Sequence, residues 1–559
     1  MAEPRRTIEP KEFRRAEADT VMFASLRAVL PHATRENRFV GLDAVAPGQR
    51  PASYHRAARQ RAPRSRRTWV SLGVLMMIMI LQALLTLRMT NTAFEDEGLY
   101  LYVGHLEIGH FLQGAALQGD YPSYFSGAPV LYPVLGALAD SLGGLAAARA
   151  LSLVEMLAAT GLVYSMTRRL FNERVGLCAA VIFAVTEPTL FLGNLATYDA
   201  TALVLLALGA WLVVRFSGDE RPLYLLAAPV LVLAVAVKYA TLLYLPSVVA
   251  LAGLAAAPRL GRKALSTSSV LGAATLALLV GAAYLAGPEY VTGFKFTTLD
   301  RFEGTSSTSS LIWDVTQWIG VPFLLAVLGA VCYARQPFTE PGEQLAPCGG
   351  RVRRALLGGL MAGSALLAPI EQIRIHTETS LFKHVGFGLV LAAPIAGMGL
   401  ARVIGDHFRR AQVGIAIWGA SLAIGMTSAS IQFNGWPNSS VFVADLAHYV
   451  RPDGRYLVEA DEVPIYYLRD NPDAQPSQFT STFYIGYVDS KGEQLTGDAG
   501  YIAAIKEGYF NVVTYNYQAT PAVDGTLAQT LAADPDYSLA AVITSANNGV
   551  RQYLWVKSR

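Results

Sequence analysis

The sequence has few cysteines and few charged residues. Only three cysteines occur among 559 residues, and their spacing forms neither a disulfide framework nor a metal-binding motif. Charged residues make up 16% of the chain and apolar residues 53%, whereas an average soluble chain carries roughly 25% charged residues. These shortages exclude a secreted disulfide-rich scaffold, a disordered chain and a simple cytosolic enzyme. The net charge of +3 is too small to indicate a nucleic acid partner.

The apolar residues gather in runs that are long enough to cross a membrane. A polar, arginine-rich tail is followed by the apolar run Trp69–Leu87, which is close to the ~20 residues that span a bilayer. Ten further apolar segments follow, at 146–167, 175–191, 197–215, 222–237, 240–257, 267–287, 312–334, 355–370, 384–401 and 412–430. The sequence therefore predicts an α-helical polytopic membrane protein with about 11 transmembrane helices.

The positions of arginine and lysine predict how the chain is oriented. They are frequent in the tail and in every second loop, and scarce in the loops between, as the positive-inside rule requires. We expect a plasma (inner) membrane protein whose N-terminus is cytoplasmic, with two long outer loops at 89–145 and 288–311. The parts are a flexible basic tail (1–67), a transmembrane domain (68–430) and an extracytoplasmic domain (431–559).

The last part of the chain has shorter apolar runs and more Asp, Asn, Tyr and Pro. Short strands are expected at 455–459, 509–514, 537–544 and 552–556, and helices at 500–507 and 526–533. Such alternation is typical of a small α/β domain. Four tyrosines would pack in it or line a binding surface for carbohydrate or protein: Tyr466, Tyr467, Tyr484 and Tyr487.

Three carboxylates stand together in the first outer loop. Glu95, Asp96 and Glu97 come shortly after the first span, and a membrane-surface helix is expected at 97–112, with another at 129–142. Crowded carboxylates repel one another, which raises at least one pKa and suits a proton acceptor or a metal ligand. The alternative is structural, since acidic residues favour the first turn of a helix.

Cations in the outer loops are few, so each of them needs an explanation. They include Lys238, Lys295 and Arg301, and the densest group contains Arg374, His376, Lys383 and His384. Lys, Arg and His at the outer membrane boundary would stabilise a phosphate. The alternative is snorkelling of long side chains to lipid headgroups, which explains the paired histidines poorly.

Two further acids are candidates. Asp199 begins the fourth predicted span, where it would cap the helix or face the first outer loop. Glu155 lies inside the second predicted span, and ionisable groups at such a depth are functional candidates.

The order of these motifs resembles that of a known family. Asp96-Glu97-Gly98-Leu99-Tyr100 and the helix after it look like the first outer loop of C-type, multi-span glycosyltransferases. The likeness continues through residues 132–136, 148–152, 168–171, 184–199 and 376–399. The chain is similar to the bacterial branch of the dolichyl-phosphate-mannose–protein mannosyltransferase family, which includes the lipid A aminoarabinose transferases.

The resemblance implies the C-type glycosyltransferase fold, with the catalytic part in residues 68–430. It also implies a polyprenyl-phosphate monosaccharide as donor and sugar transfer at the outer face. The family's first-loop Asp corresponds to Asp96 and its second acid to Asp199. Its phosphate-holding cations correspond to Lys238, His376, Lys383 and His384.

The chemistry agrees with this expectation. A phosphate leaves as a stable anion, so one carboxylate that deprotonates the acceptor hydroxyl is sufficient. We expect a hexosyl- or pentosyltransferase with Asp96 as base, Glu97 or Asp199 positioning a substrate, and inversion of the sugar. No cofactor is required by this scheme, but Asp96 and Glu97 would be the ligands of a divalent cation if one takes part. The sugar stays open, as does the acceptor, which is a glycan, a lipid or a protein.

The rival interpretation is a transporter or flippase for polyprenyl lipids or sugars. Transporters place charged groups and broken helices near the membrane midplane. Glu155 is the main feature that fits that pattern, whereas the other candidates lie at the outer ends of the spans.

Overall fold

A computed structural model describes residues 66–117, 119–219, 221–301, 303–336 and 349–558. The predicted flexible tail lies almost entirely outside the described residues. Within them, seven segments are long and apolar enough to cross a membrane, and an eighth is a pair of helices bent by 48°. The predicted polytopic helical fold is confirmed, so the protein is a multi-pass membrane protein.

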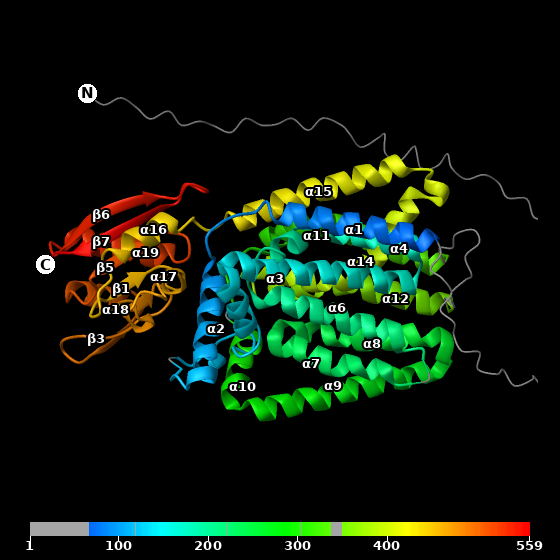
Figure 1. Cartoon of the computed structure of the whole chain (residues 1–559), viewed down its shortest axis with the longest axis horizontal. Helices are drawn as coiled ribbons and strands as arrows, with labels where there is room; N and C mark the ends of the chain where they lie inside the picture. The colour runs from blue at the N-terminus through cyan, green and yellow to red at the C-terminus, as the bar shows by residue number, and fades with distance from the viewer. Residues whose placement is uncertain (1–65, 118, 220, 302, 337–348, 559) are drawn as a thin grey trace, which may run out of the picture. The chain divides into compact units, whose positions relative to one another are not determined.

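The long segments coincide with predicted spans, and Figure 1 shows them running side by side. Helix α14 lies among them with every residue from Val385 to Ala401 buried. The segments are α1 (Arg66–Thr86), α3 (Tyr132–Leu170), α6 (Tyr198–Phe216), α11 (Thr308–Arg335), α14 (Leu381–Ile404), α15 (Ala411–Phe433), and Tyr239–Ala286, which holds α8 (Leu245–Leu260) and α9 (Ala264–Ala286).

Three predicted spans are shorter or broken, so fewer segments than the predicted eleven pass as full crossings. The segment at 175–191 is α4 (Glu173–Phe183) followed by α5 (Glu187–Leu192), the segment at 222–237 contains α7 (Ala227–Val237), and the segment at 355–370 is α12 (Arg351–Ser364) followed by α13 (Leu367–Arg374). Pro188 lies in the first turn of α5, where a missing N–H is tolerated. A new helix therefore begins there.

The first outer loop contains the predicted surface helix as α2 (Glu95–Gln113). The second predicted surface helix is the first part of α3, which is broken at Gly143 and Gly144. Figure 1 shows α2 and α10 (Pro288–Phe294) lying across the ends of the long helices. Helix α2 packs closely on α3 because Gly104 has no side chain, and a Cβ there would collide with the carbonyl group of Pro133.

The C-terminal residues form the predicted small α/β domain. Its five-stranded sheet has the order β2-β1-β5-β7-β6, with β1 parallel to β2 and β5, and β7 antiparallel to β5 and β6. The strands are β1 (Tyr456–Val458), β2 (Phe479–Ser481), β5 (Val512–Tyr515), β6 (Tyr537–Thr544) and β7 (Arg551–Lys557). The other elements are α16 (Ser440–Ala447), α17 (Glu462–Tyr467), α18 (Gly497–Lys506), α19 (Pro521–Ala533) and the hairpin of β3 (Gly486–Val488) and β4 (Gln494–Thr496).

The α/β domain contacts α2 directly. A Cβ on Gly98 would lie 2.8 Å from the carbonyl oxygen of Glu462, so α17 approaches α2 closely at a glycine. Nearby, buried Asp140 accepts hydrogen bonds from Tyr466 Oη (2.6 Å) and Arg469 Nη2 (3.0 Å). Tyr466 and Tyr467, two of the four tyrosines expected to pack or to line a binding surface, therefore belong to the helix that packs on α2.

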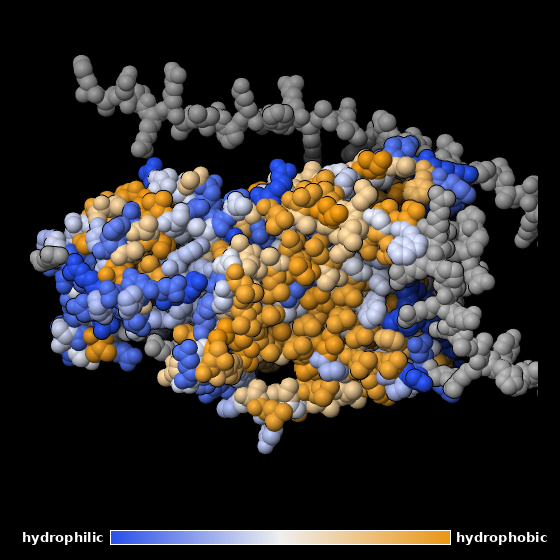
Figure 2. Space-filling model, in the orientation of Figure 1, coloured by the Kyte–Doolittle hydropathy of each residue, from blue (hydrophilic) through white to orange (hydrophobic). Residues whose placement is uncertain are grey.

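The surface of the helical part is apolar, as lipid contact requires. Figure 2 shows a broad apolar surface over the long helices, whereas polar residues gather over the α/β domain. Large apolar side chains are exposed along α9, where Val280 is 63% exposed and Leu285 is 84% exposed. Apolar patches of this extent mark a surface that another apolar phase covers.

Candidate functional site

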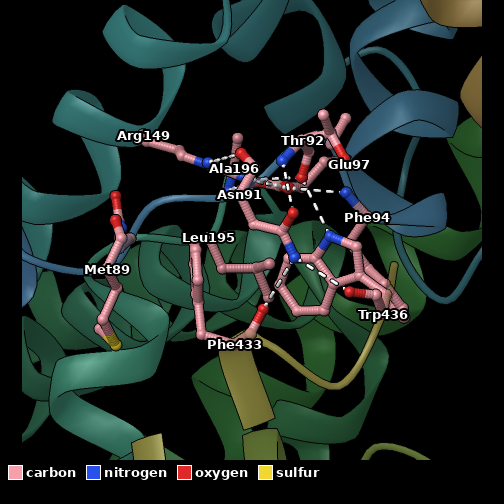
Figure 3. A network of polar contacts seen from close by, with 12 residues as sticks. Met89, Asn91, Thr92, Phe94, Glu97, Arg149, Leu195, Ala196, Phe433 and Trp436 are labelled. Atoms are coloured by element: carbon pink, nitrogen blue, oxygen red, sulfur yellow. Dashed lines mark hydrogen bonds and ion pairs between the residues drawn. The ribbon is translucent and has the colours of Figure 1, made fainter. Parts of the chain in front are cut away.

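The start of α2 is fixed by a buried ion pair. Arg149 Nη2 lies 2.6 Å from Glu97 Oε2, and Arg149 Nε lies 2.8 Å from Glu97 Oε1. The backbone N–H groups of Phe94 and Ala196 donate to the same carboxylate at 2.9 and 2.7 Å. Figure 3 shows this network, in which Arg149 also donates to the carbonyl oxygens of Asn91 and Thr92.

This network gives Glu97 a structural environment. Its side chain is fully buried, it does not line the cavity described next, and its two oxygens accept four hydrogen bonds. A bidentate pair with Arg holds a carboxylate in one orientation. Glu97 thus does not face a substrate cavity, as a substrate-positioning residue would. With Glu97 held by Arg149, the side chain of Asp96, one residue earlier, points in a different direction.

Asp96 lines a cavity of about 580 Å³. Lys383, from the first turn of α14, donates to Asp96 Oδ2, and Tyr100 Oη donates to Asp96 Oδ1 at 3.3 Å. The rest of the wall is largely apolar or aromatic and includes Leu242, Leu243, Tyr244, Phe294, Phe296 and Phe387. The cavity therefore combines an acid and a cation with a lining suited to a lipid chain, and we call it the reaction cavity.

A second acid–cation pair lies beside the first. Lys238 Nζ is 2.6 Å from Asp199 Oδ1, and both side chains are almost completely buried. Lys238 lines the reaction cavity, whereas Asp199 lies behind it. Thr197 Oγ1 donates to Asp199 Oδ2 at 2.9 Å, and Lys238 Nζ lies 4.7 Å from the centroid of the Tyr198 ring. Lys238 has extended backbone angles at the end of α7, which directs its side chain away from the helix path.

Two more of the predicted cations line the reaction cavity. His384 follows Lys383 on α14, and its Nδ1 lies 3.0 Å from Nε2 of Gln372. Arg301 lies after the short π-helix Lys295–Leu299, and its Nη2 donates to the carbonyl oxygen of Thr379 at 2.5 Å. Burial lowers the pKa of the Arg301 guanidinium.

The remaining predicted residues lie outside this cavity. Arg374 pairs with Glu371 at the surface (2.6 Å), His376 is exposed, and Lys295 is exposed. Within the helical part, Thr201 Oγ1 donates one hydrogen bond that is shared between the two carboxylate oxygens of Glu155, at 2.8 and 2.9 Å. The predicted Arg/Lys/His group is thus divided between the cavity and the surface.

Among the lining residues that were not predicted from the sequence, three are joined by hydrogen bonds. Tyr198 Oη lies 2.5 Å from Tyr100 Oη and is hydrogen bonded to Ser126 Oγ. All three side chains line the reaction cavity. Tyr100 could have been found, because position i+4 from Asp96 lies on the same face of a helix. Tyr198 and Ser126 join it only through the tertiary fold.

Glu95 does not line the reaction cavity. Burial, and after it the neighbouring Asp96 carboxylate, raise the pKa of Glu95, which lies at about 7 although the charge of Lys383 lowers it. The carboxylates of Glu95, Asp96 and Glu97 therefore have three different environments.

The acids do not fit a divalent cation. Asp96 faces Lys383 and Glu97 is enclosed by Arg149. Among the described residues, no group of three or more His, Cys, Asp or Glu side chains is arranged to hold a metal ion.

Comparisons with known proteins support the resemblance seen in the sequence. The family model described as dolichyl-phosphate-mannose-protein mannosyltransferase matches residues 129–286. No curated protein matches the chain by sequence. The expected likeness to the C-type glycosyltransferases is confirmed by this match together with the fold.

Solved structures with a similar fold include the following two. ArnT from Cupriavidus metallidurans, bound to undecaprenyl phosphate, aligns with a TM-score of 0.53 and 15% identity over 88% of this chain and 98% of its own. The archaeal oligosaccharyltransferase AglB from Archaeoglobus fulgidus, with an inhibitory peptide and a dolichol-phosphate, aligns with a TM-score of 0.52 and 11% identity over 87% of this chain and 74% of its own. At these identities the likeness is one of fold.

Proposed function

We propose that this protein is a membrane glycosyltransferase that moves a monosaccharide from a polyprenyl-phosphate donor to a hydroxyl acceptor at the outer face of the membrane. The observation that carries the proposal is the ion pair of Asp96 and Lys383 in the wall of a large, mostly apolar cavity. The family match over residues 129–286 supports a glycosyltransferase. The ArnT structure supports the donor class, because that protein of similar fold was bound to undecaprenyl phosphate.

The cavity supplies cations for the departing phosphate. Lys383, Lys238 and Arg301 line it, beside His384. In the free protein, Asp96 alone is paired with the positive charge of Lys383. A phosphate oxygen of the donor near Lys383 Nζ would share that positive charge. Fixed cations in a site with little water stabilise developing negative charge strongly. The apolar and aromatic lining would hold the first isoprene units of the donor.

Asp96 is the base of the proposed reaction. Its carboxylate takes the proton from the acceptor hydroxyl while the acceptor oxygen forms a bond to the anomeric carbon. The bond between that carbon and the phosphate oxygen breaks, and the electron pair stays on the phosphate. One displacement of this kind inverts the anomeric centre. Asp199 acts by positioning Lys238, which it contacts at 2.6 Å.

Substitution of Asp96 tests the proposal. With the full chain in lipid nanodiscs and a labelled polyprenyl-phosphate sugar, Asp96→Asn should lower sugar transfer at least about 100-fold. Donor binding should stay within a few-fold of the wild type, because Lys238, Arg301 and His384 remain. Asp120→Asn is the matched control, since Asp120 is an exposed acid of the same outer loop, and it should transfer sugar normally.

Two results would contradict the proposal. One is full transfer by Asp96→Asn. The other is movement of intact labelled donor between leaflets with no release of sugar by the wild type, which is the result expected of a flippase.

The orientation is part of the proposal and has its own test. The arginine pattern predicts that the α/β domain is extracytoplasmic. A single cysteine at exposed position 491, in a variant without the native cysteines, should react with an impermeant thiol reagent in intact cells. Labelling that requires opened cells would reverse the orientation.

A further inference from the structure

A second cavity, of about 330 Å³, lies next to the reaction cavity. Residues that are adjacent in the sequence line different cavities: Phe94 and Glu95 line the second cavity, and Asp96 lines the first. Likewise Phe382 lines the second cavity and Lys383 the first. The ion pair of Asp96 and Lys383 therefore lies between the two cavities.

The helical part supplies an aromatic wall to this second cavity. Phe94 and Trp436 have ring centroids 5.0 Å apart, and Phe191 and Phe382 have centroids 5.2 Å apart. Trp436 Nε1 donates to the carbonyl oxygen of Thr92 at 3.0 Å, which fixes the indole plane. Figure 3 shows Trp436 and Phe94 at this position beside the Glu97 network.

The α/β domain supplies a polar wall that faces the aromatic one. Asn516, Gln518 and Gln552 line the cavity from this domain. Asn516 Nδ2 lies 3.4 Å from Gln552 Oε1. The side chain of Gln518 is exposed, so its amide is available to a ligand.

A buried carboxylate shapes the polar wall. Glu459 is 1% exposed, and its Oε1 accepts the backbone N–H groups of Gln518 (2.8 Å), Ala519 (2.6 Å) and Thr520 (3.3 Å). The backbone N–H of Asn516 donates to its other oxygen. The loop is thus wrapped around one carboxylate, which holds Asn516 and Gln518 at the cavity.

The chemistry of the lining selects the class of ligand. No Lys or Arg is among the lining residues, which include Glu95 and Glu459. The adjacent Lys383 is already paired with Asp96, so an anionic group would meet acids without a free lining cation. Side-chain amides both donate and accept hydrogen bonds, as sugar hydroxyls do. Aromatic faces suit the apolar C–H faces of a sugar ring, and the volume is within the ~300–1,000 Å³ typical of small-molecule sites.

We propose that this second cavity binds the uncharged, hydroxyl-rich end of a glycan acceptor, with Gln518 of the α/β domain as a specificity-determining residue. The inference rests on the proposed transferase function, because the acceptor hydroxyl must reach Asp96 from the side opposite to the donor. It assigns the α/β domain a part in choosing the acceptor.

The test uses the full chain in nanodiscs with a labelled polyprenyl-phosphate sugar and three acceptor probes. These are an octyl disaccharide of neutral hexoses, an octyl uronic acid and a Ser/Thr peptide. The neutral disaccharide should be preferred at least about 10-fold over the other two. Gln518→Ala should raise the KM for the disaccharide about 5- to 10-fold, the loss of about one hydrogen bond, and should leave the KM for the donor unchanged.

Controls separate this inference from the proposed function. Gln494→Ala changes an exposed glutamine of β4 outside the cavity and should leave both KM values unchanged. Preference for the uronic acid or the peptide, or equal acceptor KM values in the two glutamine variants, would overturn the acceptor site. Slow release of labelled sugar to water would then still show donor cleavage. Absence of both transfer and release would instead remove the transferase proposal on which the acceptor site rests.

Discussion

Lys383 and Asp96 form an ion pair although 287 positions separate them in the sequence. The pair joins the first turn of α14 to the first turn of α2. The Lys383 side chain is 3% exposed and that of Asp96 is 27% exposed, so substrate reaches the acid more easily than the cation. In the proposed reaction the same lysine holds the base in the free protein and the phosphate in the complex.

Replacement of Lys383 should therefore affect the donor. We expect Lys383→Met to lower kcat/KM for the donor at least about 100-fold, the usual effect of removing one preorganised charge-stabilising donor. Lys383→Arg should retain part of the activity because the charge remains. Initial rates at varied donor concentration give these values.

Lys295 provides the matched control. It is exposed and does not line the reaction cavity, so Lys295→Met should keep wild-type kinetics. Equal losses in the two Met variants would show that net charge, and not the position of Lys383, matters.

Glu97 and Asp96 should respond differently to substitution although they are neighbours. Glu97 is fully buried against Arg149, and removing one partner of a buried pair costs about 3–5 kcal/mol. We expect Glu97→Gln to lower the apparent melting temperature in detergent clearly. Asp96→Asn should lower it less, because Asp96 is 27% exposed and the Lys383 that it leaves unpaired lines the reaction cavity. Thermal unfolding followed by tryptophan fluorescence measures both. An unchanged melting temperature for Glu97→Gln, together with lost transfer, would return Glu97 to a direct role in the chemistry.

The sequence predicted the parts of the fold that follow from local pattern. Apolar runs identified the long helices, and the surface helix expected at 97–112 is present as α2. The scarcity of outer cations singled out Lys238 and Lys383, which do line the reaction cavity. These signals are local, since each depends on hydropathy or charge within a few residues.

The rest depends on contacts between distant segments. Nothing near Glu97 in the sequence indicates Arg149 as its partner, and proximity of Arg374, His376 and Lys383 along the chain did not bring them into one site. His376 has a φ of +49° in the turn between α13 and α14, which reverses the chain and places neighbours on different sides. Hydropathy also does not separate full crossings from shorter helices such as α7, which are apolar without being long enough to span.

The pH dependence of acceptor use should report on Glu95. Burial and the Asp96 carboxylate raise the pKa of Glu95 to about 7, with smaller effects of Lys383, which lowers it, and of Glu459 and Asp461, which raise it. Below pH 7 the group is therefore mostly neutral, and above pH 7 it becomes a carboxylate that accepts a hydrogen bond from a hydroxyl. We expect the acceptor KM of the wild type to fall as the pH rises through about 7.

Glu95→Gln supplies the comparison, since its side chain is neutral at every pH. The acceptor KM of this variant should match that of the wild type within about 2-fold at pH 5.5 and should be higher than that of the wild type at pH 8.5. Acceptor titrations at the two pH values measure both. A fall in KM near pH 7 that persists in Glu95→Gln would assign the titration to another group.

The pair of Lys238 and Asp199 should behave as one unit. Both side chains are buried and lie 2.6 Å apart, so each single substitution leaves one uncompensated charge in the helical part. We expect Asp199→Asn and Lys238→Met each to lower thermal stability more than the double variant does, since the double variant removes both charges.

The three variants should rank differently in sugar transfer than in stability, because Lys238 lines the reaction cavity and Asp199 does not. Asp199→Asn should keep some activity through the remaining cation, whereas both variants that lack Lys238 should lose donor affinity about equally. A double-mutant cycle on melting temperature and on donor KM measures the two couplings, and additive losses of stability would show that the two groups do not depend on each other.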